Sequence, residues 1–151
     1  MSITITKPFL ILNVKVGTPS EIGLTGAGAR RFIPIIGGQV CGSIQGEIIP
    51  GGADWQTIHD NGNLQIEAHY AVRAQNGSVI EVLSSGVRAG APEVLKRLAA
   101  GDMVDPGEYY FRTAIRFRTG APELTHLNFR LGIAKGERRR DSVRLEVFEV
   151  V

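Results

Sequence analysis

Hydrophobic and polar residues alternate along most of this chain with a period of two, which is typical of half-buried β-strands. The alternation is clearest from Leu64 to Val72, where every second residue is apolar, and it recurs from Tyr109 to Thr119. Further strands are expected at residues 3–16, where Pro8 interrupts the strand early, and at residues 30–36, 37–49, 55–60, 79–87, 124–134 and 142–150. The pattern therefore predicts about nine strands.

The connections between these segments favour antiparallel hairpins. Asp60-Asn61-Gly62 and Asn76-Gly77 are turn sequences that supply the positive backbone angles of tight hairpins. Residues 17–29 show no sustained period and are expected to form a long connection. Only residues 91–100 have the pattern of a helix, with Pro92 in an early helical position and Gly101 at the end.

Glycines interrupt the run from residue 37 to residue 52, where they indicate bends or close approaches of the backbone. Pro50-Gly51-Gly52 is expected to be a turn before the next strand. Evenly spaced strands with such bends favour a closed antiparallel β-barrel, because closure removes the exposed edges of a sheet. A two-sheet sandwich is the alternative. Either way, residues 1–151 are expected to form a single domain.

Composition narrows the classes of function. The charges of the 17 basic and 15 acidic residues nearly balance. The one basic cluster, Arg138-Arg139-Arg140, is flanked by acidic residues in a predicted hairpin turn, so a nucleic-acid partner is not expected. The single cysteine, Cys41, excludes an internal disulfide. The N-terminus has no signal-peptide pattern and no apolar run could span a membrane, so a cytoplasmic protein with no membrane partner is expected.

Candidate chemistry begins with Asp54, which adjoins the only tryptophan, Trp55. A carboxyl group in an apolar, aromatic setting has a raised pKa and can act as a general acid or base. Trp55 is a candidate stacking wall for a ligand. The alternatives are a turn role for Asp54 and a core-packing role for Trp55.

Several segments resemble the DUF3237 (UPF0311) family of small bacterial and fungal proteins. The resemblance covers most of the chain and is carried by RRFIPIIGG (residues 30–38), Gly46, IIPGGADW (residues 48–55), YYFRT (residues 109–113), Phe117, Thr119-Gly120 and Leu127-Asn128. It implies a calycin-like or allene-oxide-cyclase-like barrel. The family has no established general activity. Where such proteins often carry a tryptophan before the Leu-Asn pair, this chain has His126.

The family-like segments supply further candidate residues. Tyr110 and Arg112 lie in YYFRT, and an inward-facing guanidinium there would anchor an anionic ligand. If it faces outward, Arg112 is a solvated arginine. Asp54, Tyr110 and Arg112 are therefore expected to be catalytic, and the following residues are expected to bind substrate in the same cavity: Trp55, Tyr70, His126 and Asn128. A surface position is the alternative for His126.

Other chemistries lack support in the sequence. The segment GAGARR is not followed by a helix or by the lysine of a phosphate-binding loop. The three histidines lie on separate segments, so neither a metal nor another cofactor is expected. The sequence predicts a small-molecule-binding barrel that acts as a cofactor-independent lyase, isomerase or cyclase. The alternative is a non-catalytic, lipocalin-like binding protein. A homodimer is expected, because several strands carry apolar residues that a lone barrel would expose.

Overall fold

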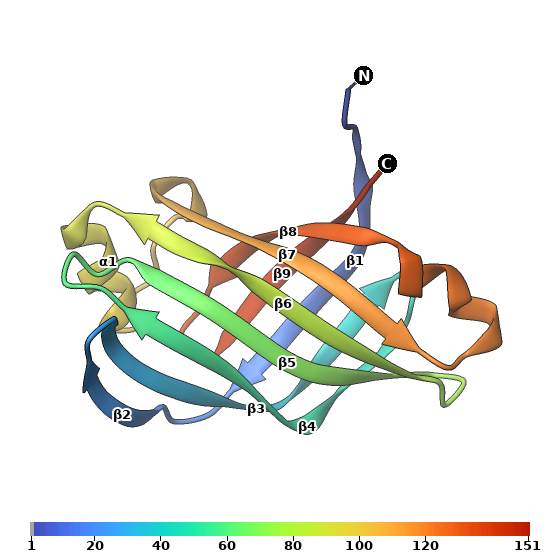
Figure 1. The fold of residues 1–151 in the computed structure, drawn as a ribbon, viewed down its shortest axis with the longest axis horizontal. Coiled ribbons are helices and arrows are strands. Elements are labelled where there is room, and N and C mark those ends of the chain that lie inside the picture. The colour runs from blue at the N-terminus through green and yellow to red at the C-terminus, as the bar shows by residue number, and fades with distance from the viewer. Residues whose placement is uncertain (1) are drawn as a thin grey trace.

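The computed structural model describes residues 2–151 as one antiparallel sheet that closes into a barrel (Figure 1). Its strands are β1 (Ile5–Val16), β2 (Ser20–Thr25), β3 (Gly28–Gly42), β4 (Gly46–Ile58), β5 (Leu64–Ala74), β6 (Val79–Gly90), β7 (Tyr109–Thr119), β8 (Leu131–Arg138) and β9 (Ser142–Val150). The helices are α1 (Pro92–Ala99) and the 3₁₀ segments η1 (Pro106–Glu108) and η2 (Pro122–Phe129).

The barrel closes through β1, which pairs with β9 on one side and with β3 on the other. Eight strands thus form a continuous wall in the order β1-β9-β8-β7-β6-β5-β4-β3. The remaining strand, β2, lies outside this circuit and pairs only with β3. The predicted closed antiparallel barrel, with about nine strands and little helix, is confirmed.

The glycine-rich run differs in detail from its prediction. The separate strands expected over residues 30–36 and 37–49 are divided differently in the structure. One strand, β3, continues through both to Gly42, residues 43–45 are the connection, and β4 begins at Gly46. Pro50-Gly51-Gly52 is not a turn between strands but an irregularity within β4. A Cβ atom at Gly52 would lie 2.5 Å from the carbonyl oxygen of His69, so only glycine lets β4 approach β5 this closely.

Two other segments were assigned wrongly from the sequence. The expected long connection over residues 17–29 contains β2, whose residues are all exposed, so no buried face imposes an alternating pattern. The first half of the expected strand over residues 124–134 is the 3₁₀ segment η2. Its apolar residues Leu124 and Leu127 are three apart, which matches the period of a 3₁₀ helix, and Pro122 starts the segment.

The interior of the barrel is mostly apolar, and its largest fully buried side chains are Leu12, Ile48, Ile80, Val82, Ile115 and Val147. Toward the end where β6 leads into α1, the polar side chains of Gln56 and Arg88 are also buried. The helix α1 contributes Val94, Leu95 and Leu98 to the hydrophobic core. This end of the barrel holds the candidate site.

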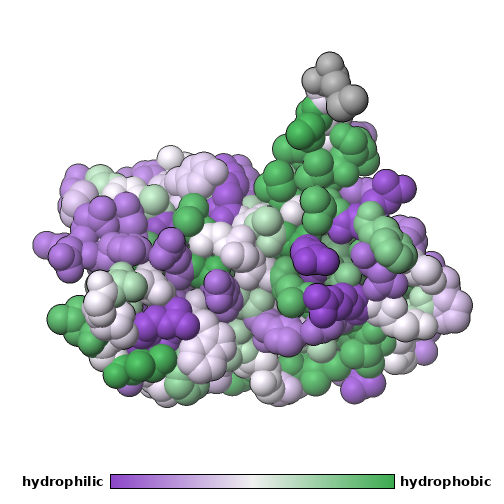
Figure 2. All heavy atoms as spheres, viewed as in Figure 1, coloured by the Kyte–Doolittle hydropathy of each residue, from purple (hydrophilic) through white to green (hydrophobic). Residues whose placement is uncertain are grey.

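The start of β1 and the end of β9 form a ribbon that projects from the barrel (Figure 1). Two backbone hydrogen bonds between Thr4 and Val151 join its strands, at 3.1 and 2.9 Å. The ribbon exposes Ile3 and Ile5, and Figure 2 shows hydrophobic residues gathered on it. Across residues 2–151, no helix is long and apolar enough to cross a membrane.

Candidate functional site

A small cavity of about 30 Å³ lies inside the barrel. Most of its wall is apolar and comes from Val14, Val16, Ile35, Ile66, Ala68, Phe111, Val143 and Leu145. Four polar residues complete the wall: Asp54, Tyr70, Ser84 and Thr113. A cavity of this size has room for about one or two water molecules. The composition of this wall, mostly apolar with a few convergent polar groups, is typical of a small-molecule site, although the cavity is far smaller than the roughly 300 to 1,000 Å³ of most such sites.

Asp54 is the acid of this cavity. It faces inward from β4, and its Oδ2 atom accepts a hydrogen bond of 2.8 Å from Gln56 Nε2. Its Oδ1 atom is buried and has no hydrogen-bond partner within the described part of the chain. Burial raises the pKa of Asp54 from 3.8 to about 6, against the opposing effects of the Gln56 hydrogen bond and the charge of Arg88. The carboxyl group can therefore exchange a proton near neutral pH.

Two hydroxyl groups in the same wall also lack partners among residues 2–151: Tyr70 OH and Thr113 Oγ1. Both side chains are only 4% exposed. Burial raises the pKa of the Tyr70 phenol, and the nearby Asp54 raises it further, so the phenol keeps its proton. Unsatisfied buried polar groups are uncommon in native proteins and call for an explanation. Here Tyr70 and Thr113 can donate hydrogen bonds to a ligand oxygen beside Asp54.

A polar layer separates the cavity from the end of the barrel near α1. Arg31 on β3 donates a 2.8 Å hydrogen bond from Nε to Gln56 Oε1, and Gln56 in turn binds Asp54. Arg88 on β6 lies with its guanidinium 5.8 Å from the ring centroid of Phe111, which lines the cavity. The layer thus links Arg31 to the buried acid through Gln56, and the positive charge of Arg88 acts on the same acid.

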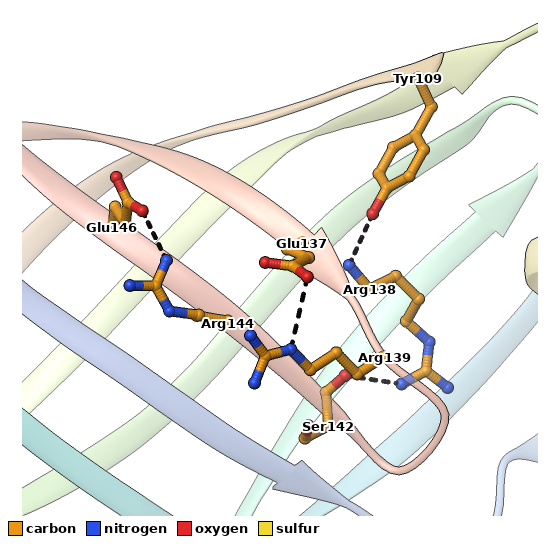
Figure 3. A network of polar contacts seen from close by, with 7 residues as sticks. All are labelled: Tyr109, Glu137, Arg138, Arg139, Ser142, Arg144 and Glu146. Carbon is orange, nitrogen blue, oxygen red and sulfur yellow. Dashed lines mark hydrogen bonds and ion pairs between the residues drawn. The ribbon is translucent and has the colours of Figure 1, made fainter. Parts of the chain in front are cut away.

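Tyr109 and Arg138 complete this end of the barrel. Figure 3 shows the hydroxyl of Tyr109 accepting a 2.9 Å hydrogen bond from the backbone N–H of Arg138. The Arg138 side chain donates from Nη1 to the carbonyl oxygen of Ser142 at 3.2 Å. Burial lowers the pKa of Arg138, and repulsion from Arg31 lowers it further.

The predicted site residues fall into two groups. Asp54 and Tyr70 line the cavity together. Tyr110 and Arg112 do not, because on β7 the residues Phe111 and Thr113 face inward and their neighbours along the strand must face outward. The expectation that Arg112 shares a cavity with Asp54 is therefore wrong.

The outward contacts of these two residues are local. Tyr110 is 54% exposed. The guanidinium of Arg112 lies 5.2 Å from the Tyr110 ring centroid and donates a 2.9 Å hydrogen bond to the carbonyl oxygen of Phe111. Neither side chain reaches the cavity, so neither can act on a ligand held there.

The other three candidates also lie outside the cavity. Trp55 follows the inward-facing Asp54, so it faces outward, where it is 39% exposed and its ring lies 4.8 Å from that of Phe32. His126 is exposed on η2. Asn128, also on η2, binds the backbone of Thr119 through two hydrogen bonds of 2.8 and 3.0 Å. The role of Asn128 is to hold η2 against β7.

Several polar residues at this end of the barrel are not among the predicted site residues: Arg31, Gln56, Arg88, Tyr109 and Arg138 of the polar layer, and Thr113 of the cavity wall. A signal for some of them was present. Arg88 falls in phase with the buried Ile80 and Val82 of β6, and Arg31 falls in phase with the buried Ile33 of β3. An arginine on the apolar phase of a strand is a candidate buried cation, whereas Arg112 lies on the polar phase of its strand.

The described residues contain no group of three or more histidine, cysteine, aspartate or glutamate side chains that could hold a metal ion. Of the histidines, His69 pairs with Glu81 at 2.6 Å on the outer surface. His59 contacts Gln65 at 3.3 Å.

The fold and the site define a class: a closed eight-stranded antiparallel barrel with an additional strand and a buried acid in a small interior cavity. Within that class, the chain belongs to the family described as "Protein of unknown function (DUF3237)", whose model matches residues 5–150. A UPF0311 protein of Bradyrhizobium diazoefficiens is 39% identical over 97% of this chain and 96% of its own. A UPF0311 protein of Clostridium acetobutylicum is 31% identical over 99% of this chain and 89% of its own.

Solved structures show the same architecture. A conserved protein of unknown function from Rhodopseudomonas palustris has 37% identity and a TM-score of 0.91, with complete coverage of both chains. A β-barrel-like protein from Acinetobacter baumannii has 33% identity and a TM-score of 0.86, over 100% of this chain and 98% of its own. A structure described as an enzyme from Penicillium herquei has a TM-score of 0.70 at 16% identity, over 99% and 94% of the two chains, which is a likeness of fold alone.

Proposed function

We propose that the barrel binds a small oxygenated organic molecule and that Asp54 moves a proton on it without a cofactor, as in an isomerase, lyase or cyclase. One observation carries this proposal. Among residues 2–151, the buried Oδ1 atom of Asp54 and the hydroxyl group of Tyr70 have no hydrogen-bond partner, and both residues line the cavity. A carboxyl group with a pKa of about 6 is well placed for general acid–base catalysis near neutral pH.

The chemistry follows from the two groups. Ionised Asp54 takes a proton from a carbon next to a carbonyl group, and the electrons of the broken C–H bond move into the carbonyl to form an enolate. The phenol of Tyr70 donates a hydrogen bond to the enolate oxygen, which carries the developing charge. Protonated Asp54 then returns the proton to the same or a neighbouring carbon.

Solvent exchange tests this step without knowledge of the product. A panel of carbonyl compounds is incubated with the protein in deuterated buffer, and loss of the C–H signal is followed by proton NMR. We expect exchange with at least one compound, at a rate that rises with pH through about 6 as Asp54 ionises. Asp54→Asn should slow exchange by about 10²- to 10⁴-fold, the usual contribution of a general acid or base.

Glu67→Gln is the matched control, because Glu67 is an exposed carboxylate on the outer face of neighbouring β5. The Glu67→Gln variant should catalyse proton exchange of the compound at the wild-type rate. Exchange that persists in Asp54→Asn would refute the assignment of the base. Binding of a compound without exchange would instead favour the non-catalytic binding protein.

A further inference from the structure

Three arginines meet on the inside of the barrel at the end near α1: Arg31, Arg88 and Arg138. They come from β3, β6 and β8, so residues far apart in sequence produce one concentration of positive charge. Arg31 and Arg88 line one cleft. Burial lowers the pKa of Arg88 to about 10, with repulsion from Arg138 and Arg31 as further causes. The opposing groups facing Arg88 are Asp54 and the phenol of Tyr109.

Among residues 2–151, Arg88 is a buried cation with an unsatisfied hydrogen-bond donor. It is 7% exposed, and its Nε atom is buried with no hydrogen-bond acceptor within the described chain. By contrast, Arg31 donates to Gln56 and Arg138 donates to Ser142. A buried guanidinium normally binds a carboxylate or another acceptor, because an unpaired donor away from water is costly. The unused donor of Arg88 therefore indicates a missing acceptor.

A cleft of about 190 Å³ opens beside this arginine, between α1 and the end of the barrel. Its cationic lining consists of Arg31, Arg88 and Lys96, with Asp60 as its acid. Much of the rest is apolar: Ile58, Leu64, Pro92, Leu95 and Ala99. The cleft is several times larger than the interior cavity.

The cleft and the cavity adjoin through the polar layer. Arg31 lines the cleft and connects through Gln56 to Asp54, which lines the cavity. Arg88 lines the cleft and covers Phe111, which lines the cavity. A molecule seated in the cleft with its charged end on the arginines would thus lie next to the buried acid.

We propose that this cleft is a binding site for a small organic carboxylate with an apolar body, whose carboxylate is held by Arg88 together with Arg31. The planar fork of a guanidinium matches the two oxygens of a carboxylate, and the apolar lining matches a hydrocarbon or aromatic body better than a small inorganic anion. The site deepens the proposed function and rests on it only for the orientation of the ligand toward Asp54.

Benzoate and its neutral isostere benzamide test the site. Proton–nitrogen NMR follows the Nε–H signals of the arginines, and calorimetry gives the dissociation constants. We expect benzoate to shift the Arg88 signal and benzamide to bind at least about tenfold more weakly, because a hydrogen bond to a charged group is lost. Inorganic phosphate should bind more weakly than benzoate. Equal binding of benzamide, stronger binding of phosphate, or an unshifted Arg88 signal would overturn the proposal.

Variants then locate the anchor. Arg88→Met should weaken benzoate binding by at least about tenfold, and Arg88→Lys, which keeps the charge but not the fork, should also weaken it. The control is Arg118→Met, which removes the same charge from an exposed position on β7 and should bind within about twofold of wild type. Circular dichroism verifies that each variant is folded. Wild-type affinity in a folded Arg88→Met would overturn the assignment.

The same measurements on Asp54→Asn separate this site from the proposed reaction. This variant should bind benzoate no more weakly than wild type, since it loses a negative charge near the arginines. If Arg88→Met keeps its affinity while Asp54→Asn loses proton exchange, the carboxylate site is wrong and the proposed function stands. If the reverse holds, the carboxylate site stands and Asp54 is not the base.

Discussion

Replacing Asp54 with asparagine should stabilise the protein at neutral pH and remove part of its pH dependence. Burial raises the pKa of this carboxyl group from 3.8 to about 6, so between these values the folded protein holds a proton that the unfolded chain has released. The free energy of unfolding therefore falls as the pH rises through this window. The pKa change corresponds to about 3 kcal/mol once the group is ionised in both states.

Asparagine has nearly the same shape but does not ionise. From about pH 4 to about pH 7.5, the unfolding free energy of Asp54→Asn should rise relative to wild type by about 2 to 3 kcal/mol. For a chain of this length, that difference corresponds to roughly 4 to 12 °C in the melting temperature. Urea unfolding of both proteins across this pH range measures it.

Glu67→Gln is the control, since it removes an exposed carboxylate from the outer face and should follow the wild-type curve. Taking the difference between variant and wild type removes the contributions of all other titrating groups. Parallel stability profiles for Asp54→Asn and wild type would refute the reasoning. So would a carbon NMR titration that places the pKa of Asp54 near that of an exposed aspartate.

Three further predictions concern the same site and the outer surface. Arg88→Met should raise the pKa of Asp54 above its wild-type value of about 6, because the charge of Arg88 lowers it; a carbon NMR titration with an unchanged or lower pKa would contradict this. Tyr70→Phe should raise the unfolding free energy, measured in urea, by about 1 kcal/mol, because it removes a buried hydroxyl group that has no partner among residues 2–151. The variant should also slow proton exchange, and a variant less stable than wild type would contradict this prediction. We also propose that the protein forms a two-fold dimer through a groove of about 760 Å³ on its outer surface. The groove lies between the projecting ribbon, at residues 3 and 150, and the exposed side chains of Leu131 and Ile133 on β8, so the ribbon of each copy can lie in the groove of the other. Sedimentation should then show a dimer at micromolar concentration and a monomer for Ile133→Lys, and a monomeric wild-type protein would exclude it.

Local patterns in the sequence were enough to predict the class of fold. Alternation located most of the strands, because burial of one sheet face imposes a period of two, and Asn61-Gly62 and Asn76-Gly77 marked hairpins that the structure contains. The helix near residues 92–99 was also readable from its proline start and its apolar stripe. These signals are local, so they can be recognised in the sequence without knowledge of the tertiary structure. Where the local burial pattern was weak, as in β2, the prediction failed.

The sequence also held more about the site than the family-like motifs suggested. Adjacent residues on a strand point to opposite faces, so Asp54 and Trp55 could not both line one interior cavity. The same rule separates Arg112 from Phe111 and Thr113. The inward or outward phase of a residue along its strand thus predicted cavity-lining residues better than its membership of a family-like motif. Arg88 lies on the buried phase of β6, and the structure places it in the polar layer.

Which inward-facing groups meet could not be predicted from local patterns, because it depends on how the strands pair. Asp54, Arg88 and Arg138 come from β4, β6 and β8, and their convergence depends on the register of each strand pair and on the closure of β1 onto β3. The unpartnered state of Asp54 Oδ1 among the described residues is likewise a property of the closed barrel. Register and closure arise from contacts between distant segments, and a period of two along one strand carries no information about them.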